Sequence, residues 1–367
     1  MPPTAARRVL IVSAAMGGGH LAISRELQRR LERRGHEVML VDQLDAMPRP
    51  TGKALERLYP LLVNRTPGLY QLVYDVFFVA EQRAGERVGV PVRLALPGLR
   101  RTVRSFSPDV AVGTHPLCSV ALGELRGEGS LRCPAVTLVT TFSLNTLWLH
   151  PEVDLEICIS ADAAADAQRR TGRPAAVSGP VVRPGFQPAA RADGEHRPPP
   201  LPGVQPGTCV ALVSTGSVGL AGAALQAAAA LARHPRWTPV VLCGRSERLR
   251  QRVERLPGAV AMPWVADMAG LLERTDVLVD NAGGMSAKEA LGAGVPVVTF
   301  RPLSGHGRDD AAALLRLGVT DVVHDDAALV AAVERLRTDP EHRRERVSRG
   351  RRLFVADVAD LVLQAAS

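Results

Sequence analysis

Short apolar runs recur along the chain, each followed by a glycine-containing turn or an amphipathic stretch. Runs that are apolar at every position are typical of parallel strands buried on both faces of a sheet. Leu27 and Leu31 then line one face of a predicted helix from Leu21 to Arg34, with arginines opposite. Strands that alternate with helices predict an α/β fold. The predicted strands are Val9 to Ser13, Glu37 to Val41, Pro108 to Val112, Val136 to Thr141, Cys209 to Ser214, Val240 to Gly244, Val277 to Val279 and Val295 to Thr299.

The pattern of strand, glycine turn and helix begins twice, which predicts two Rossmann-like domains. Gly17 to His20 follow the first strand, and Thr215 to Gly219 follow the strand that starts at Cys209. The proline-rich interval between the two halves is typical of an interdomain linker. We therefore expect a first domain over residues 1–186, a linker over 187–207, a second domain over 208–342, and a basic terminal helix over 343–367 that crosses back to the first domain.

Composition fits a two-domain protein that works on an anionic ligand. The sequence has 367 residues, 46% hydrophobic and 22% charged, and can bury two sizeable cores. No apolar run reaches the roughly 18 residues of a membrane span, and the stretch before Val9 is too short for a signal peptide, so we expect a cytoplasmic protein. The five cysteines lack metal-ligand spacing. The net charge of +8 lies mainly in the first half, and aromatics are not interleaved with the arginines, which favours an anionic lipid or phosphate-bearing ligand over a nucleic acid.

The stretch from Val277 to Thr299 places a turn and a short helix between two buried strands. In an open α/β sheet, phosphates bind where a loop leaves the carboxyl end of a strand and enters a helix. The glycines of the turn let the backbone approach a ligand, and Ser286 is expected to cap a helix from Ala287 to about Ala293. Glu289 has two interpretations: its carboxylate grips a ribose diol, or it completes a capping box with Ser286. The local pattern alone favours the cap.

From Val9 to about Gly318 the chain resembles the monogalactosyldiacylglycerol synthases and the peptidoglycan lipid N-acetylglucosaminyltransferases. The motifs that carry the resemblance are Gly17 to His20, a Thr-His-Pro that contains His115, a segment from Phe142 to Trp148 preceded by Thr141 in place of an aspartate, and a donor loop from Arg301 to Asp310. These families are UDP-sugar glycosyltransferases with two Rossmann-like domains facing a central cleft, the glycosyltransferase-B fold. The resemblance implies an inverting, metal-independent transfer of a hexose or N-acetylhexosamine to a lipid, a lipid-like molecule or a secondary metabolite.

The resemblance also implies an active site. His20 is the expected general base, because an imidazole can take the proton of an acceptor hydroxyl near neutral pH and a helix N-terminus keeps it neutral. His115, on an equivalent strand end, is the rival base. In the donor loop His306 stands for the family's glutamine and Asp310 for its asparagine, which leaves the sugar open. The residues expected to bind the UDP-sugar are Gly18, Gly19, Gly216, Ser217, Gly219, Gly244, Val265, Met268, Gly283, Gly284, Met285, Ser286, Glu289, Gly305, His306, Asp309 and Asp310.

We expect neither a metal nor a cofactor besides the UDP-sugar co-substrate. The chain has no Asp-x-Asp pair, so the charge of the pyrophosphate is expected to meet backbone N–H groups of Gly216 to Gly219 and Gly283 to Ser286.

Two other functions stay open at this point. Gly17-x-Gly19-x-x-Ala22 followed by Asp42 satisfies the dinucleotide fingerprint of an NAD-dependent oxidoreductase. A UDP-sugar epimerase shares the fold and needs no acceptor. A second glycine turn followed by the stretch around Glu289 is not what an oxidoreductase predicts, and this favours the glycosyltransferase.

Residues 55–104 concentrate tyrosines and phenylalanines beside arginines. One interpretation is a surface that binds anionic membranes, which predicts peripheral attachment to the inner face of the plasma membrane. The other is ordinary core packing, and the two are evenly balanced on the sequence.

Overall fold

The computed structural model describes residues 6–16, 18–56, 89–186, 199, 201–215, 221–303 and 305–367, except for the side chains of Ala221 and His306. The chain divides into two compact units. Unit 1 comprises residues 1–181 and 355–367, and unit 2 comprises residues 182–354. Among the described residues, no helix is long and apolar enough to cross a membrane.

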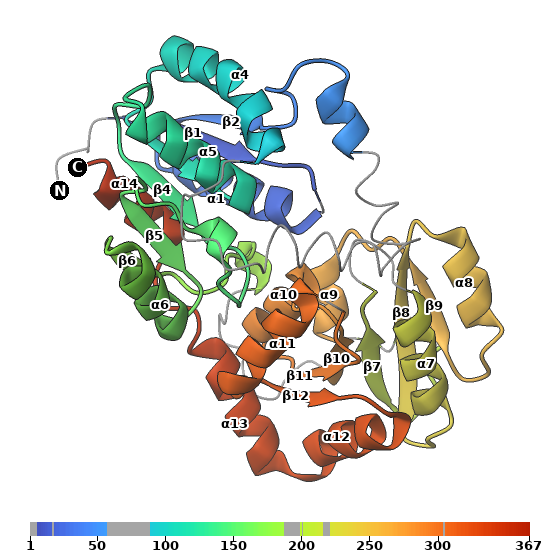
Figure 1. Cartoon of the computed structure of the whole chain (residues 1–367). Helices are drawn as coiled ribbons and strands as arrows, with labels where there is room; N and C mark the ends of the chain where they lie inside the picture. The colour runs from blue at the N-terminus through green and yellow to red at the C-terminus, as the bar shows by residue number, and fades with distance from the viewer. Residues whose placement is uncertain are drawn as a thin grey trace. The chain divides into compact units, whose positions relative to one another are not determined.

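Unit 1 is built on a parallel sheet of six strands in the order β2-β1-β3-β4-β5-β6 (Figure 1). Because every neighbouring pair is parallel, each connection crosses over through a helix or loop. The strands are β1 (Arg8–Ser13), β2 (Glu37–Asp42), β3 (Val110–Gly113), β4 (Ala135–Leu138), β5 (Leu155–Cys158) and β6 (Ala175–Val177). The helices are α1 (Gly18–Arg33), α4 (Val90–Phe106), α5 (Pro116–Gly127), the 3-10 turn η2 (Thr146–Trp148), α6 (Ala161–Thr171) and α14 (Val358–Ala365).

Helices cover both faces of this sheet. Leu10 and Val12 of β1 share a core with apolar residues of α4 and α5, whereas α1 and α14 contact each other as well as the strands. Ion pairs join α1 to the start of α14, where Arg30 and Arg34 both reach Asp357. Burial of apolar surface on both faces explains why the strands are apolar at nearly every position.

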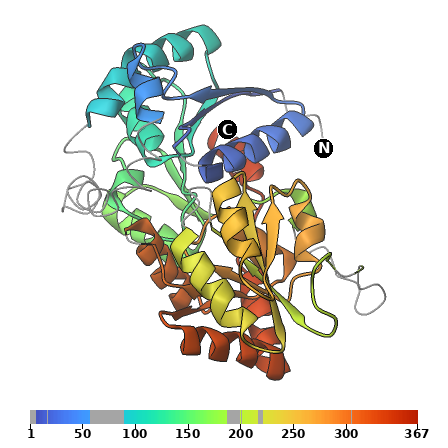
Figure 2. The same cartoon turned by 90° about the vertical axis from the view of Figure 1, so that its right-hand side faces the viewer.

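Unit 2 repeats the plan with the strand order β12-β11-β10-β7-β8-β9, also parallel throughout (Figure 1). Figure 2 shows the same structure turned by 90°. The strands are β7 (Cys209–Val213), β8 (Trp237–Gly244), β9 (Val260–Pro263), β10 (Val277–Asp280), β11 (Val297–Phe300) and β12 (Thr320–Val323). The helices are the 3-10 turn η3 (Pro184–Phe186), α7 (Ala221–Ala232), α8 (Glu247–Glu254), α9 (Met268–Leu272), α10 (Met285–Ala293), α11 (His306–Arg316), α12 (Asp326–Thr338) and α13 (Pro340–Arg351).

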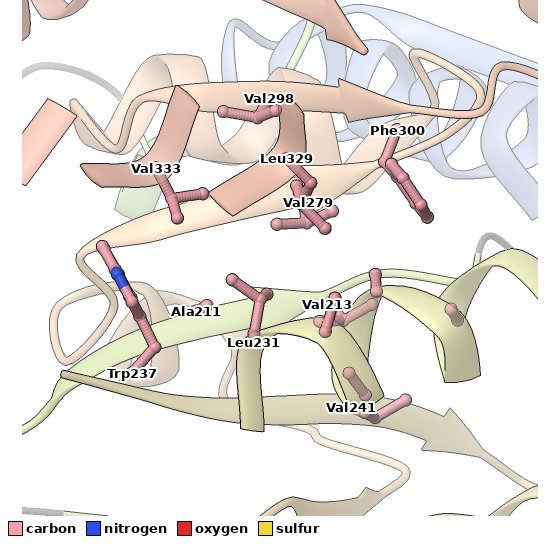
Figure 3. Close-up of a cluster of buried hydrophobic side chains, with 14 of the residues drawn as sticks. Ala211, Val213, Leu231, Trp237, Val241, Val279, Val298, Phe300, Leu329 and Val333 are labelled. Carbon is pink, nitrogen blue, oxygen red and sulfur yellow. The ribbon is translucent and has the colours of Figure 1, made fainter. Parts of the chain in front are cut away.

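The core of unit 2 lies between the sheet and helices α7, α8 and α12. Figure 3 shows Val213, Val279 and Val298 of three adjacent strands facing Leu231 of α7 and Val333 of α12. Small alanines on α7 let that helix lie close to the strands, as its alanine-rich sequence predicts.

Each sheet has one point where the strand order reverses. In unit 1 it falls between β1 and β3, and in unit 2 between β7 and β10. Loops at the carboxyl ends of the two strands diverge there, which creates the place where open α/β sheets bind ligands. In both units the candidate residues therefore lie at the carboxyl ends of the strands next to the point where the strand order reverses.

The structure differs from the sequence prediction at the start of α1 and in the terminal segment. Helix α1 begins at Gly18 rather than Leu21, so His20 lies in its first turn. The sequence predicts one terminal helix over 343–367 that crosses back to the first domain. The segment instead forms two helices: α13 contacts α10 and α12 of unit 2, and the chain returns to unit 1 from Val355 onward. In the C-terminal segment of unit 1, only α14 is helical.

Candidate active site

His20 is held at the reversal point of unit 1. Its Nδ1 lies 3.0 Å from the backbone carbonyl oxygen of Thr114 and 2.8 Å from the hydroxyl of Thr140. A carbonyl oxygen only accepts hydrogen bonds, so Nδ1 carries the hydrogen and Nε2 is the basic nitrogen of the neutral ring. The strand ends therefore fix both the orientation and the tautomer of this imidazole.

A buried hydroxyl network fixes the start of α1 against the sheet. The hydroxyl of Ser24 lies 2.9 Å from that of Ser13 and 2.7 Å from that of Thr114, and also reaches the backbone carbonyl oxygen of His20. Since buried polar groups need partners, this arrangement sets the position of the first turn.

His115 is close to His20 but has a different role in the structure. The two rings meet edge to face with centroids 4.7 Å apart. Nδ1 of His115 accepts the N–H of Leu117 and caps α5, so Nε2 carries the hydrogen when this ring is neutral. Burial and the neighbouring His20 hold the pKa of His115 well below its usual range. His115 is therefore a neutral hydrogen-bond donor beside His20.

Thr141, which stands in place of the family's aspartate, forms its hydrogen bonds within its own loop. Its hydroxyl donates to the carbonyl oxygen of Ser143 at 2.7 Å and accepts the indole N–H of Trp148 at 2.9 Å. The neighbouring Thr140, 5% exposed, contacts His20. Thr140 could not be predicted from the sequence, because a threonine at a strand end carries no signal of its own.

Asp42, the residue on which the dinucleotide interpretation depends, uses its carboxylate to accept backbone hydrogen bonds. Its two carboxylate oxygens accept the N–H groups of Ala15 and Leu44 at 3.2 and 2.9 Å. Burial raises the pKa of Asp42 despite these bonds. The carboxylate thus holds the loop after β1, which argues against a role in binding a ribose.

In unit 2, the turn after β10 is shaped by Asp280. One oxygen of this buried carboxylate accepts the N–H groups of both Ala282 and Gly283, at 3.0 and 2.7 Å. Gly283 has φ +63°, and a Cβ there would lie 3.1 Å from the Cβ of Asp310, so any other residue would be strained. The N–H of Gly283, predicted to meet a pyrophosphate, donates to Asp280 in this structure. The pyrophosphate contact of residues 284–286 stays a prediction.

The expected capping box does not form. Helix α10 begins at Met285, its N-cap is Gly284, and no side chain caps it. Ser286 lies inside the helix and accepts a hydrogen bond from the hydroxyl of Ser214 at 3.2 Å. Glu289 is 8% exposed and pairs with Arg183 at 3.6 Å, and burial raises its pKa against the effect of Arg183. The capping interpretation of Glu289, favoured by the local pattern, is therefore wrong.

A second uncapped helix start lies next to the first. Helix α11 begins after Gly305, which has φ +75°, and it has no side-chain cap. The N–H of Leu303 donates to the carbonyl oxygen of Asn281 at 2.8 Å, which joins the two loops. Asp310 of α11 is buried, whereas Asp309 is exposed. The two helix starts thus present N–H groups and positive dipole ends close together, as a diphosphate requires.

The loops after β8 and β9 lie along the same edge of the sheet. Gly244 has φ +55°, a Cβ at this position would meet no atom within 4 Å, and Val265 and Met268 are half-buried. Trp264 is 67% exposed, and the guanidinium of Arg245 lies 5.3 Å from the centre of its ring. An exposed indole offers a flat face on which a nucleobase can stack.

Several residues that shape the site could not be identified from the sequence pattern. Asp280, Lys288 and Arg183 would be found only by knowing which loops meet at the sheet edge. Three expected donor residues lie outside the described residues, as do residues 57–88 of the aromatic segment, and the side chain of His306 is likewise not described. The three are Gly216, Ser217 and Gly219.

Comparisons with known proteins agree with this geometry. Residues 20–181 match the family model described as monogalactosyldiacylglycerol (MGDG) synthase. Processive diacylglycerol beta-glucosyltransferases of Bacillus cereus and Bacillus anthracis are each 24% identical over 347 residues, which cover 90% of this chain and 86% of theirs.

Solved structures share the fold over almost the whole chain. The glycotransferase of kitacinnamycin has a TM-score of 0.61 at 21% identity and covers 99% of this chain and 100% of its own. MurG of Acinetobacter baumannii has a TM-score of 0.60 at 15% identity, covering 98% of this chain and 99% of its own.

The protein is a glycosyltransferase with the glycosyltransferase-B fold. Within that class, the resemblance to the monogalactosyldiacylglycerol synthases and the peptidoglycan lipid N-acetylglucosaminyltransferases is confirmed. The oxidoreductase and epimerase alternatives are not favoured.

Proposed function

We propose that the protein transfers a hexose or N-acetylhexosamine from a UDP-sugar to a hydroxyl of diacylglycerol or a related lipid, with inversion at the anomeric carbon. The names of its relatives, diacylglycerol beta-glucosyltransferases, support this acceptor class. The observation that carries the proposal is the contact of His20 Nδ1 with the carbonyl oxygen of Thr114, from which we infer that Nε2 is the basic nitrogen.

In this mechanism His20 is the general base. The acceptor oxygen bonds to the anomeric carbon while the bond from that carbon to the UDP oxygen breaks, and the acceptor proton passes to Nε2 of His20. The cationic ring is then stabilised through Nδ1–H by the Thr114 carbonyl oxygen and the Thr140 hydroxyl. A single displacement of this kind inverts the anomeric centre.

His115 is proposed to donate a hydrogen bond rather than to act as the base. Its Nδ1 lone pair is used in capping α5, and its low pKa keeps it neutral beside a protonated His20. Two adjacent cations would repel each other, so a neutral neighbour favours proton uptake by His20.

The donor is proposed to bind at the carboxyl edge of the sheet of unit 2. Glu289 accepts hydrogen bonds from the ribose hydroxyls, the N–H groups at the start of α10 and α11 receive the pyrophosphate, and Trp264 stacks on the base. Two helix starts supply the positive potential that the leaving group needs. The reaction accordingly needs no divalent metal and no cofactor.

Attachment to an anionic membrane is proposed to bring the enzyme to its acceptor, at the inner face of the plasma membrane. Helix α4 contains four arginines and no acidic residue, and Arg93, Arg101 and Arg104 are exposed together with Val90. Arginines on one helix face bind anionic headgroups, and exposed apolar groups enter the interface.

Calorimetric titration with UDP tests the donor half of the proposal. Glu289→Gln keeps the size of the side chain and removes its charge, so we expect UDP affinity to fall by about 1.5 to 3 kcal/mol while the melting temperature changes little. Glu273→Gln, on a residue just after α9, is the matched control. Unchanged UDP affinity in Glu289→Gln would remove Glu289 from the donor site.

A further inference from the structure

Lys288 is a buried ammonium group directly beneath the turn that enters α10. It is one of only two lysines in the chain and is 4% exposed. Its Nζ donates to the carbonyl oxygen of Gly283 at 2.9 Å, one residue before the N-cap of the helix. Burying an ammonium group costs several kcal/mol unless opposite charges surround it, so its presence here needs an explanation.

Asp280 and Asp310 supply those charges together with Glu289, whose own charge is balanced by Arg183. Asp280 is 3% exposed and Asp310 is 2% exposed. Burial lowers the pKa of Lys288, and the charges of Asp310, Asp280 and Glu289 oppose that shift. Burial likewise raises the pKa of Asp280, against its backbone hydrogen bonds and the charge of Lys288. The carboxylates and the ammonium therefore form one electrostatic unit.

The formal charge of this unit bears directly on an anion bound at the helix start. Asp280, Asp310 and Lys288 together carry −1, and without the lysine they would carry −2. Charges in a poorly solvated turn are screened far less than charges at the surface. A doubly charged carboxylate pair beneath α10 would thus repel a diphosphate and cancel the helix dipole.

We propose that Lys288 is the internal countercation of the donor site, a positioning residue that makes the turn after β10 able to accept a diphosphate. It acts in two ways, by binding the Gly283 carbonyl oxygen and by balancing Asp280 and Asp310. It does not itself contact the ligand. This proposal rests on the proposed function, because it assumes that a nucleoside diphosphate binds at this turn.

The alternative is that Lys288 only stabilises the conformation of the turn through its hydrogen bond. Loss of that hydrogen bond would lower the affinity for every ligand of the site equally, whereas loss of a countercation would lower the affinity for charged ligands only. Uridine shares the base and ribose of UDP but lacks its phosphates. Comparing UDP with uridine therefore separates the two roles.

The experiment measures both ligands by calorimetry on a series of full-length variants. Lys288→Met removes the positive charge, and Asp280→Asn removes a negative charge while its amide oxygen can still accept from the turn N–H groups. The double variant restores the wild-type formal charge. Lys53→Met, at an exposed lysine in unit 1, is the matched control for loss of a lysine.

We expect UDP affinity to follow the charge of the cluster. Lys288→Met should weaken UDP binding by roughly tenfold or more, the double variant should recover most of that loss, and Asp280→Asn alone should bind UDP several-fold more tightly. Uridine affinity should change by less than about twofold throughout. If Lys288→Met does not fold, the comparison of wild type with Asp280→Asn still tests the sign of the effect.

Each result decides the question. Equal losses for UDP and uridine in Lys288→Met, or UDP affinity unchanged in both single variants, would overturn the countercation. Binding of neither ligand by the wild-type protein would instead overturn the donor site itself.

Discussion

Glu156 gives a prediction whose magnitude follows from the structure. It lies on β5 of unit 1, between β4 and the edge strand β6, and is fully buried. Neither carboxyl oxygen has a hydrogen-bond partner, and the hydroxyl of Thr137, directly opposite on β4, lies outside hydrogen-bond geometry. Burial raises the pKa of Glu156 to about 8. The side chain is therefore a neutral acid in the folded protein near neutral pH.

The sign of the pH dependence follows from the raised pKa. The unfolded chain releases this proton near pH 4.5, whereas the folded chain keeps it up to about pH 8. Stability is thus fully present below pH 4.5 and is lost as pH rises toward 8. One pKa unit corresponds to about 1.4 kcal/mol, so the loss between pH 5 and pH 8 is about 3 kcal/mol. Glu156→Gln removes this contribution, because the amide does not titrate.

Native-state hydrogen exchange of the β4 and β5 amides measures the effect within unit 1. The stability gain of Glu156→Gln over wild type should grow by about 3 kcal/mol from pH 5 to pH 8. Glu32→Gln, at an exposed position on α1, is the control and should show no such slope. A gain independent of pH would mean that Glu156 is ionised in the folded protein and would refute the reasoning.

Two further predictions concern the chemistry and the membrane. His20→Ala should lower kcat by about a hundredfold or more with near-normal UDP affinity, Thr140→Val should lower it less, and His115→Ala should also do less. A His20→Ala enzyme that keeps most of its kcat would place the base elsewhere. The fraction of protein that sediments with anionic vesicles should fall as the salt concentration rises. The double variant Arg101→Gln, Arg104→Gln should lower that fraction further. Equal recovery with neutral vesicles would exclude the electrostatic contact.

The strands and the doubled α/β pattern could be predicted from the sequence because they depend on local periodicity. Residues buried on both faces of a parallel sheet form apolar runs, and the runs around Val9 and Val277 are β1 and β10. The glycine stop of α10 was also predictable, since Gly294 adopts the left-handed conformation that ends the helix.

The details of the site were less predictable, because they depend on contacts between distant segments. Ser286 and Glu289 have the spacing of a capping box, yet Ser286 bonds to Ser214 and Glu289 pairs with Arg183. Tertiary partners outcompeted the local bond in both cases. Likewise, nothing around Thr140 in the sequence indicates that the fold of unit 1 would bring His20 against it.

Transfer of radiolabelled sugar from UDP-glucose to diacylglycerol, in buffer that contains EDTA, tests the central claim most directly. We predict a labelled glycolipid whose anomeric configuration is opposite to that of the donor, formed at an undiminished rate in the chelator and lost in His20→Ala. UDP-galactose and UDP-N-acetylglucosamine tested in parallel identify the sugar. No labelled lipid from any of the three donors, or retention of the donor configuration, would contradict the account.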